Sequence, residues 1–127
     1  MRIIGYGIDA VKIADIKAEV DSPNKRWAEQ FCSADERECA GTTPARYRYF
    51  ASCFAAKEAV VKAIGTGFAG DITWRGIEIL RRDSGAPYIR LRDEVLELAA
   101  SMGITDWFIS ISYLDEVAMA SVIAVGE

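Results

Sequence analysis

One stretch, residues 46–67, constrains the fold most, because its sequence RYRYFASCFAAKEAVVKAIGTG predicts a single long helix that runs into a glycine turn. Thr43-Pro44 is a start signal, since a hydroxyl can cap free backbone N–H groups and proline suits the first helical position. Gly65 and Gly67 predict the stop. Between these signals apolar residues recur at spacings of three or four, which predicts that one side of the helix is core. These residues are Tyr47, Phe50, Phe54, Val61 and Ile64.

Lys57, Glu58 and Lys62 interrupt this apolar surface. Glu58 and Lys62 are four residues apart on one face, a spacing typical of a surface ion pair of little energetic weight. The turn Gly65-Thr66-Gly67 follows directly, and glycines let backbone N–H groups approach a phosphate closely. A phosphate there would meet the negative end of the helix dipole, so cations would have to offset that cost. The pattern leaves two interpretations open: a surface ion pair, or a cation-assisted phosphate site.

Composition excludes several classes of protein. The 127 residues predict one domain, and 51% hydrophobic with 27% charged residues indicates a real core without extensive disorder. No apolar run approaches the roughly 20 residues of a membrane-spanning helix, and the N-terminus lacks a signal-peptide pattern, so we expect a cytoplasmic protein that does not bind membranes. The three cysteines lack metal-ligand spacing and are expected to be reduced thiols. Histidine is absent, which excludes Ser-His-Asp and Cys-His nucleophile systems.

The net charge of -4 is unevenly distributed along the chain. Residues 9–40 contain eight acids against five bases, whereas residues 46–62 carry four bases against one acid, Glu58. The basic part is therefore the candidate anion site. An acidic chain without a basic stripe is a poor candidate for nucleic-acid binding, and we expect none.

The N-terminal part predicts a strand followed by short helices. Residues 2–8 read as a buried strand, and Asp9 falls at its expected end. There Asp9 could cap a helix that starts at Ala10, or it could bind a metal ion, and one carboxylate does not decide between these roles. A further helix is expected at residues 25–32. Ser33 then reads as the cap of another helix, with a glutamate at the third helical position.

The part after residue 67 changes from helical to extended patterns. Expected strands lie at residues 74–80 and 88–91 around a glycine turn, and at 107–111 and 117–125, with a helix at 92–102. We therefore predict an α+β fold in a single small domain, residues 1–127, with the long central helix packed on an antiparallel β-sheet.

Several blocks of the chain resemble holo-acyl-carrier-protein synthase. They are GIDAVKI near the start, FAAKEAVVKAIGTG in the middle, GIEIL followed by SGAPYIRL, and WFISIS with AMASVIA at the end. They occur in order over nearly the whole chain. The resemblance implies a magnesium-dependent phosphopantetheinyl transferase, which moves the 4'-phosphopantetheine arm of coenzyme A onto a serine of an apo acyl carrier protein and releases adenosine 3',5'-bisphosphate.

The resemblance also implies roles for individual residues. Asp9 and Glu58 match the magnesium ligands, and Lys62 matches the lysine that contacts the reacting phosphates. Glu58, directly or through a metal-bound water, would help to deprotonate the serine. The residues implied for coenzyme A binding are Lys57, Lys62, Gly65, Thr66, Gly67, Gly85, Pro87 and Ser112. The family usually forms a homotrimer with each active site at a subunit boundary, which makes a homotrimer the expected assembly.

Four positions depart from the family pattern. Cys53 stands where an arginine is common, Ala86 where a lysine is common, and Tyr113 where a histidine follows the serine of the next-to-last strand. Asp15 stands on the first helix where an arginine that contacts the acidic carrier would be expected. Three interpretations stay open: an active transferase with a specialised carrier, a non-catalytic relative that binds nucleotide or coenzyme A or serves in assembly, and a hydrolase with water as acceptor. The retained metal ligands and Lys62 favour the transferase.

Overall fold

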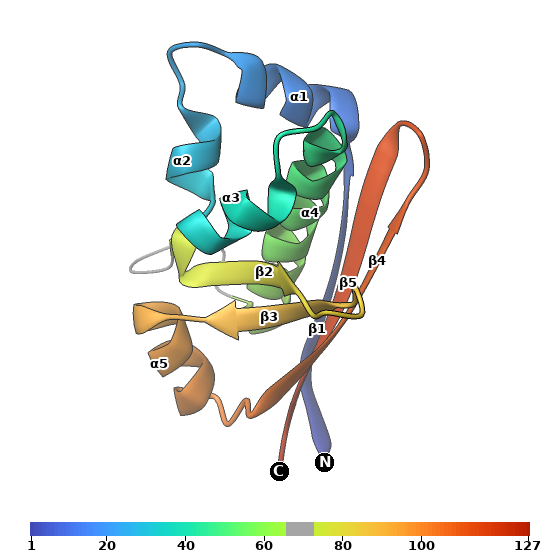
Figure 1. Cartoon of the computed structure of the whole chain (residues 1–127). Helices are drawn as coiled ribbons and strands as arrows, with labels where there is room; N and C mark the ends of the chain where they lie inside the picture. The colour runs from blue at the N-terminus through green and yellow to red at the C-terminus, as the bar shows by residue number, and fades with distance from the viewer. Residues whose placement is uncertain (66–72) are drawn as a thin grey trace.

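The computed structural model describes residues 1–65 and 73–127 (Figure 1). Its elements in chain order are β1 (Arg2–Lys12), α1 (Ile13–Asp21), α2 (Trp27–Phe31), α3 (Ala34–Ala40), α4 (Ala45–Ile64), the 3₁₀ turn η1 (Trp74–Gly76), β2 (Ile77–Arg81), β3 (Pro87–Leu91), α5 (Asp93–Ser101), β4 (Asp106–Tyr113) and β5 (Val117–Gly126). Helices pack on antiparallel strands, which confirms the predicted α+β class. In the described part of the chain, no helix is both long and apolar enough to span a membrane.

The larger sheet has the strand order β1-β5-β4, with both neighbouring pairs antiparallel. Side chains of a strand alternate between the two faces, so one face of β5 is buried under α4 while the other is exposed. The buried face of β5 consists of small residues, which leaves room for the helix. They are Ala118, Ala120, Val122 and Ala124.

Two glycines of β1 bring α4 into backbone contact with the sheet. A Cβ atom on Gly7 would lie 2.0 Å from the carbonyl oxygen of Ala59, and one on Gly5 would lie 2.1 Å from that of Ala63. Both distances are far inside van der Waals contact, so only glycine fits at these two positions. The contact therefore fixes the height of α4 above β1.

The central helix α4 confirms the predicted helix and is more deeply buried than a one-sided stripe requires. Tyr47 is the exception, because it lies outside the core and its hydroxyl donates a 2.6 Å hydrogen bond to Asp21 Oδ1. It ends at Ile64, and Gly65 follows in the left-handed conformation with φ 89°, as expected of a glycine stop. The N-cap is Pro44 and no side chain caps the first turn, so the expected hydroxyl cap is wrong. The sheet covers one side of α4, and α3 with β2 covers another (Figure 1). Small side chains make this possible, among them Ala51, Ala55, Ala56, Ala59 and Ala63.

The strand β1 is longer than predicted, and this corrects the reading of Asp9. β1 continues to Lys12, Asp9 pairs with Ala120 within the sheet, and α1 begins only at Ile13. Asp9 is therefore neither at a strand end nor a helix cap. The strand continues past Asp9 because residues 9–12 pair with β5, which provides backbone hydrogen-bond partners for an extended conformation.

The remaining elements follow the sequence signals closely, except that residues 74–76 of the expected strand at 74–80 form the 3₁₀ turn η1 and β2 begins only at Ile77. Ser33 and Glu36 form the predicted capping box at the start of α3. β2 and β3 form the predicted hairpin, whose turn contains Gly85 with φ 91°. The two final strands, β4 and β5, pair antiparallel as expected. The helix expected at residues 25–32 is the shorter α2.

Candidate functional site

The structure brings Asp9, Glu58 and Lys62 together where β1 passes under α4. Asp9 lies on the same face of β1 as Gly5 and Gly7, and this face is turned toward the helix. The ammonium Nζ of Lys62 lies 3.1 Å from Asp9 Oδ1 and donates a hydrogen bond of 2.9 Å to the carbonyl oxygen of Ile8. The Asp9 side chain is 19% exposed and that of Lys62 is 54% exposed, so the group is open to solvent on one side.

Glu58 lies one helical turn before Lys62 and is partly buried. Burial raises the pKa of its carboxyl group, the negative charge of Asp9 raises that pKa further, and Lys62 offsets part of the shift. The ion pair that the spacing predicts between Glu58 and Lys62 does not form, because Lys62 pairs with Asp9 instead. Within residues 1–65 and 73–127, no cation lies within ion-pair distance of Glu58.

The donor set fits a magnesium ion. Two carboxylates, Asp9 and Glu58, lie close enough for one to raise the pKa of the other, and a divalent cation would relieve this repulsion. The described residues contain no group of three or more acidic, histidine or cysteine side chains that would form an all-protein cage. Magnesium ions are usually held by one or two carboxylates together with phosphate oxygens and water. Asp9 and Glu58 are therefore the residues that could hold this metal.

Lys57 does not fit the phosphate contact that the resemblance implied. Its side chain is 0% exposed. Its ammonium donates hydrogen bonds of 2.7 Å to Phe31 O, 2.8 Å to Glu36 Oε1 and 3.0 Å to Trp74 O. An ammonium has three protons to donate, and all three are used inside the chain. The structure therefore places Lys57 in the core, with no ammonium proton left to donate to a phosphate.

The glycine turn after α4 is described only at its start. Gly65 is exposed and its N–H bonds the carbonyl of Val61 at 2.9 Å. Thr66 and Gly67, also expected to contact coenzyme A, lie outside the described residues.

The other residues implied for coenzyme A binding lie elsewhere on the chain. Gly85 and Pro87 belong to the turn between β2 and β3, and Ser112 is exposed on β4. Ser112 pairs with Met119 while Asp9 pairs with Ala120, so the two side chains point to opposite faces of the same sheet. One chain by itself does not present Asp9 and Ser112 on a single surface.

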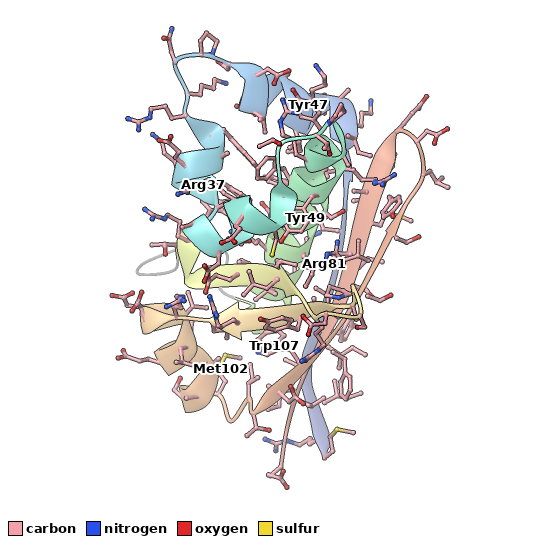
Figure 2. All side chains as sticks on the ribbon, in the orientation of Figure 1. Arg37, Tyr47, Tyr49, Arg81, Met102 and Trp107 are labelled. Carbon is pink, nitrogen blue, oxygen red and sulfur yellow. The ribbon has the colours of Figure 1, made fainter. Side chains whose placement is uncertain are left out.

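A pocket of about 210 Å³ lies between α3, α4 and the ends of β2 and β4, and two arginines line it. The guanidinium of Arg48 lies 4.2 Å from the ring centre of Tyr113, and that of Arg81 lies 5.5 Å from the ring centre of Tyr49. Figure 2 shows Tyr49 and Arg81 side by side, from α4 and β2. The hydroxyl of Ser52 also lines the pocket and is buried without a hydrogen-bond partner in the described part of the chain. Such a hydroxyl can serve a ligand.

The sequence did not identify Arg48 and Arg81 as site residues. It did show that the family's common arginine, lysine and histidine are replaced by Cys53, Ala86 and Tyr113. Cys53, which replaces a common arginine, is 1% exposed with its Sγ 4.0 Å from the carbonyl oxygen of Ile79. It is thus a core residue. Arg48 and Arg81 line the same pocket as Tyr113, which replaces one of the lost cationic residues. The excess of basic residues at 46–62 was the sequence signal for Arg48.

Comparison with known proteins identifies relatives over nearly the whole chain. The model of the 4'-phosphopantetheinyl transferase superfamily matches residues 5–120. A holo-[acyl-carrier-protein] synthase of Maridesulfovibrio salexigens is 44% identical over 123 residues, which cover 95% of this chain and 97% of the relative. The crystal structure of a holo-[acyl-carrier-protein] synthase from Neisseria meningitidis matches with a TM-score of 0.88 at 27% identity, over 98% of this chain and 99% of that one. The synthase of Helicobacter pylori in complex with coenzyme A matches with a TM-score of 0.80 at 30% identity, over 94% and 99%.

Proposed function

The chain belongs to the 4'-phosphopantetheinyl transferase superfamily, and we propose that it transfers the 4'-phosphopantetheine arm of coenzyme A to a serine of an apo acyl carrier protein. Relatives named holo-[acyl-carrier-protein] synthase, and the relative crystallised with coenzyme A, support these two substrates. The observation that carries the proposal is the convergence of Asp9, Glu58 and Lys62 beside the contact between α4 and β1. Two carboxylates and a lysine suit a reaction at a pyrophosphate.

The reaction forms one bond and breaks another at the same phosphorus atom. The serine oxygen attacks the phosphorus that carries the pantetheine arm, and the bond from this phosphorus to the bridging oxygen breaks. Adenosine 3',5'-bisphosphate leaves with the bridging oxygen, and the serine proton passes to a base. Catalysis of this kind depends on positioning, charge stabilisation and a proton acceptor.

The residues of this chain supply each of these functions. Lys62, whose side chain is half exposed beside Asp9, stabilises negative charge on the pyrophosphate. Glu58 would accept the serine proton. A magnesium ion bound by Asp9 and Glu58 would neutralise charge on the phosphate oxygens.

We place a phosphate of the nucleotide in the pocket between Arg48 and Arg81. Guanidinium groups make strong, often bidentate hydrogen bonds to phosphate oxygens. The free hydroxyl of Ser52 supports the assignment because it is a donor without a partner in the described part of the chain. Ser112 is next in sequence to Tyr113, which lines this pocket, while Gly85 and Pro87 belong to the turn after Arg81 and to β3 and do not line it.

A homotrimer is proposed as the active assembly. One coenzyme A molecule that contacts both the Asp9 group and the Ser112 side needs two chains, because these groups lie on opposite faces of one sheet. The outer face of the β1-β5-β4 sheet, which we call the outer sheet face, carries large apolar side chains that a second copy would cover. They are Ile3, Tyr6, Ile8, Phe108, Met119 and Ile123, exposed by 36% or more.

Mass spectrometry of intact carrier proteins tests the function. Several apo carriers, including one from fatty-acid synthesis, are incubated with the protein, coenzyme A and magnesium. A mass gain of one phosphopantetheine is expected on at least one carrier. The variant Glu58→Gln should lower the rate by at least about 10²-fold, while Glu97→Gln, the same change at an exposed site on α5, should not. A lack of mass gain on every carrier would favour the non-catalytic interpretation.

A further inference from the structure

Lys57 and Glu36 form a buried ion pair that the proposed reaction does not use. Both side chains are 0% exposed, and Lys57 Nζ lies 2.8 Å from Glu36 Oε1. The pair lies at the junction of several elements, because Lys57 belongs to α4 and Glu36 to α3. Lys57 is also the residue directly before the proposed metal ligand Glu58.

Each polar atom of the pair has partners in other elements. Lys57 donates to Phe31 O at the end of α2 and to Trp74 O at the start of η1. Glu36 Oε1 also accepts a bond of 3.0 Å from Ser33 N, and its Oε2 accepts one of 3.1 Å from Ile79 N in β2. The pair therefore joins α4 to four neighbouring elements through directional bonds.

The opposite side of α4 is fixed by the glycine contact with β1. There Gly5 and Gly7 hold the carbonyls of Ala63 and Ala59 at close range. This contact sets the distance between α4 and β1. Because glycine has no side chain to interlock with the helix, the contact restricts rotation of α4 about its axis less than it restricts this distance. The bonds of Lys57 restrict that rotation because they require its side chain to point at three fixed oxygens.

We propose that the Lys57–Glu36 pair is a positioning device for the site: it fixes the rotation of α4 so that Glu58 and Lys62 face Asp9. This inference rests on the proposed function of that site. With 3.6 residues per turn, a side-chain oxygen about 7 Å from the helix axis moves roughly 2.5 Å when the helix rotates by about 20°. The contact of Lys62 with Asp9 is 3.1 Å long, so a rotation of that size would break it.

A stabilising role alone does not account for the pair. Burying two charges is costly, and well-packed apolar residues in their place are often as stable or more stable. What apolar residues lack are hydrogen bonds, which have a preferred direction. Misplacement of catalytic groups by about 1 Å is enough to cost 10²-fold in rate.

Two variants test the proposal in the full chain. Lys57→Met removes the ammonium and keeps a side chain of similar length, while Glu36→Gln keeps the shape and weakens the pair. Magnesium binding is measured by calorimetry, and kcat and the KM for carrier protein by transfer kinetics, at a temperature where circular dichroism shows each variant folded. We expect Lys57→Met to weaken magnesium binding by about tenfold and to lower kcat by about 10²-fold with the carrier KM unchanged. Glu36→Gln should change both in the same direction by less.

Ile104→Ala is the matched control. Ile104 is 7% exposed and belongs to a separate apolar cluster with Ala99 and Ala124, so this variant loses stability without touching α4. It should leave magnesium binding and kcat within about twofold of the wild type. If Lys57→Met behaves like Ile104→Ala at equal loss of melting temperature, the pair is only structural and the proposal is refuted. If Lys57→Met does not fold, an unchanged magnesium affinity in Glu36→Gln refutes it instead.

The readouts separate this inference from the proposed function. A wild-type protein that binds magnesium but transfers nothing would refute the function, and calorimetry on the variants would still decide the positioning role. A wild-type protein that transfers the arm but shows no magnesium binding would leave the function standing, and the kcat values of the two variants would then decide the positioning role.

Discussion

Replacing Gly7 with alanine should damage the site through the backbone, without removing any functional group. The new Cβ would lie 2.0 Å from the carbonyl oxygen of Ala59, whereas ordinary contact begins at 3.4 Å. The helix α4 would have to move away from β1 by about 1.4 Å, or the strand would have to bend. Because Glu58 and Lys62 are on α4 while Asp9 is on β1, this displacement would act directly on the 3.1 Å contact between Lys62 and Asp9.

The expected cost has two parts. Overpacking of a rigid contact costs about 1–3 kcal/mol of unfolding free energy, and a shift of about 1 Å between catalytic groups lowers the rate by about 10²-fold. Thermal or chemical unfolding measures the first, and carrier-protein mass spectrometry over time measures the second at a temperature where the variant is folded.

Gly41→Ala is the matched control for this prediction. Gly41 has φ 73°, and a Cβ at this residue would meet no atom within 4 Å, so its replacement costs stability through backbone strain alone. It should lower the melting temperature and leave the rate of the folded protein unchanged. If Gly7→Ala loses no more activity than Gly41→Ala at equal loss of stability, close approach of α4 to β1 does not position the site.

Three further predictions address the pocket, the assembly and the pH dependence of stability. Arg81→Gln should raise the KM for coenzyme A by about tenfold, as the loss of one charge-assisted phosphate contact predicts. Arg82→Gln in the exposed turn is the control and should leave this KM unchanged. Steady-state kinetics measure both, and equal KM values in the two variants would exclude Arg81 from the phosphate pocket. Phe108→Asp on the outer sheet face should reduce the mass found by light scattering from a trimer to a monomer, and an unchanged mass would exclude this face as the interface. Burial alone would raise the pKa of Glu78, but hydrogen bonds from Arg90, Ser33 and Arg92 lower it from 4.5 to about 2. The stability from these bonds is therefore complete above about pH 4.5 and is lost as the pH falls toward 2, a change of about 3 kcal/mol in unfolding free energy. Glu78→Gln should remove this change from acid unfolding curves. An unchanged pH dependence in the variant would contradict the prediction.

The sequence alone predicted the elements whose signals are local. The stop of the long helix before Gly65, the capping box of Ser33 and Glu36, and the hairpin turn at Gly85 each depend on residues within a few positions of one another. Their geometry is set by backbone preferences that the residues carry into any fold. The family motifs likewise pointed to Asp9, Glu58 and Lys62 from the sequence by itself; their roles, like the homotrimer and the cytoplasmic location, stay predictions.

Tertiary structure decided which groups face one another. Asp9 read as a strand end because its own neighbours carry no sign that β5 continues the pairing to Lys12. Lys57 read as a phosphate ligand because its partners Phe31, Glu36 and Trp74 are 17 to 26 residues away in sequence. Arg48 and Arg81 meet in one pocket only after α4 and β2 pack together. Contacts between distant segments depend on packing and register, which short-range sequence patterns do not encode, and these contacts determine which side chains form the site.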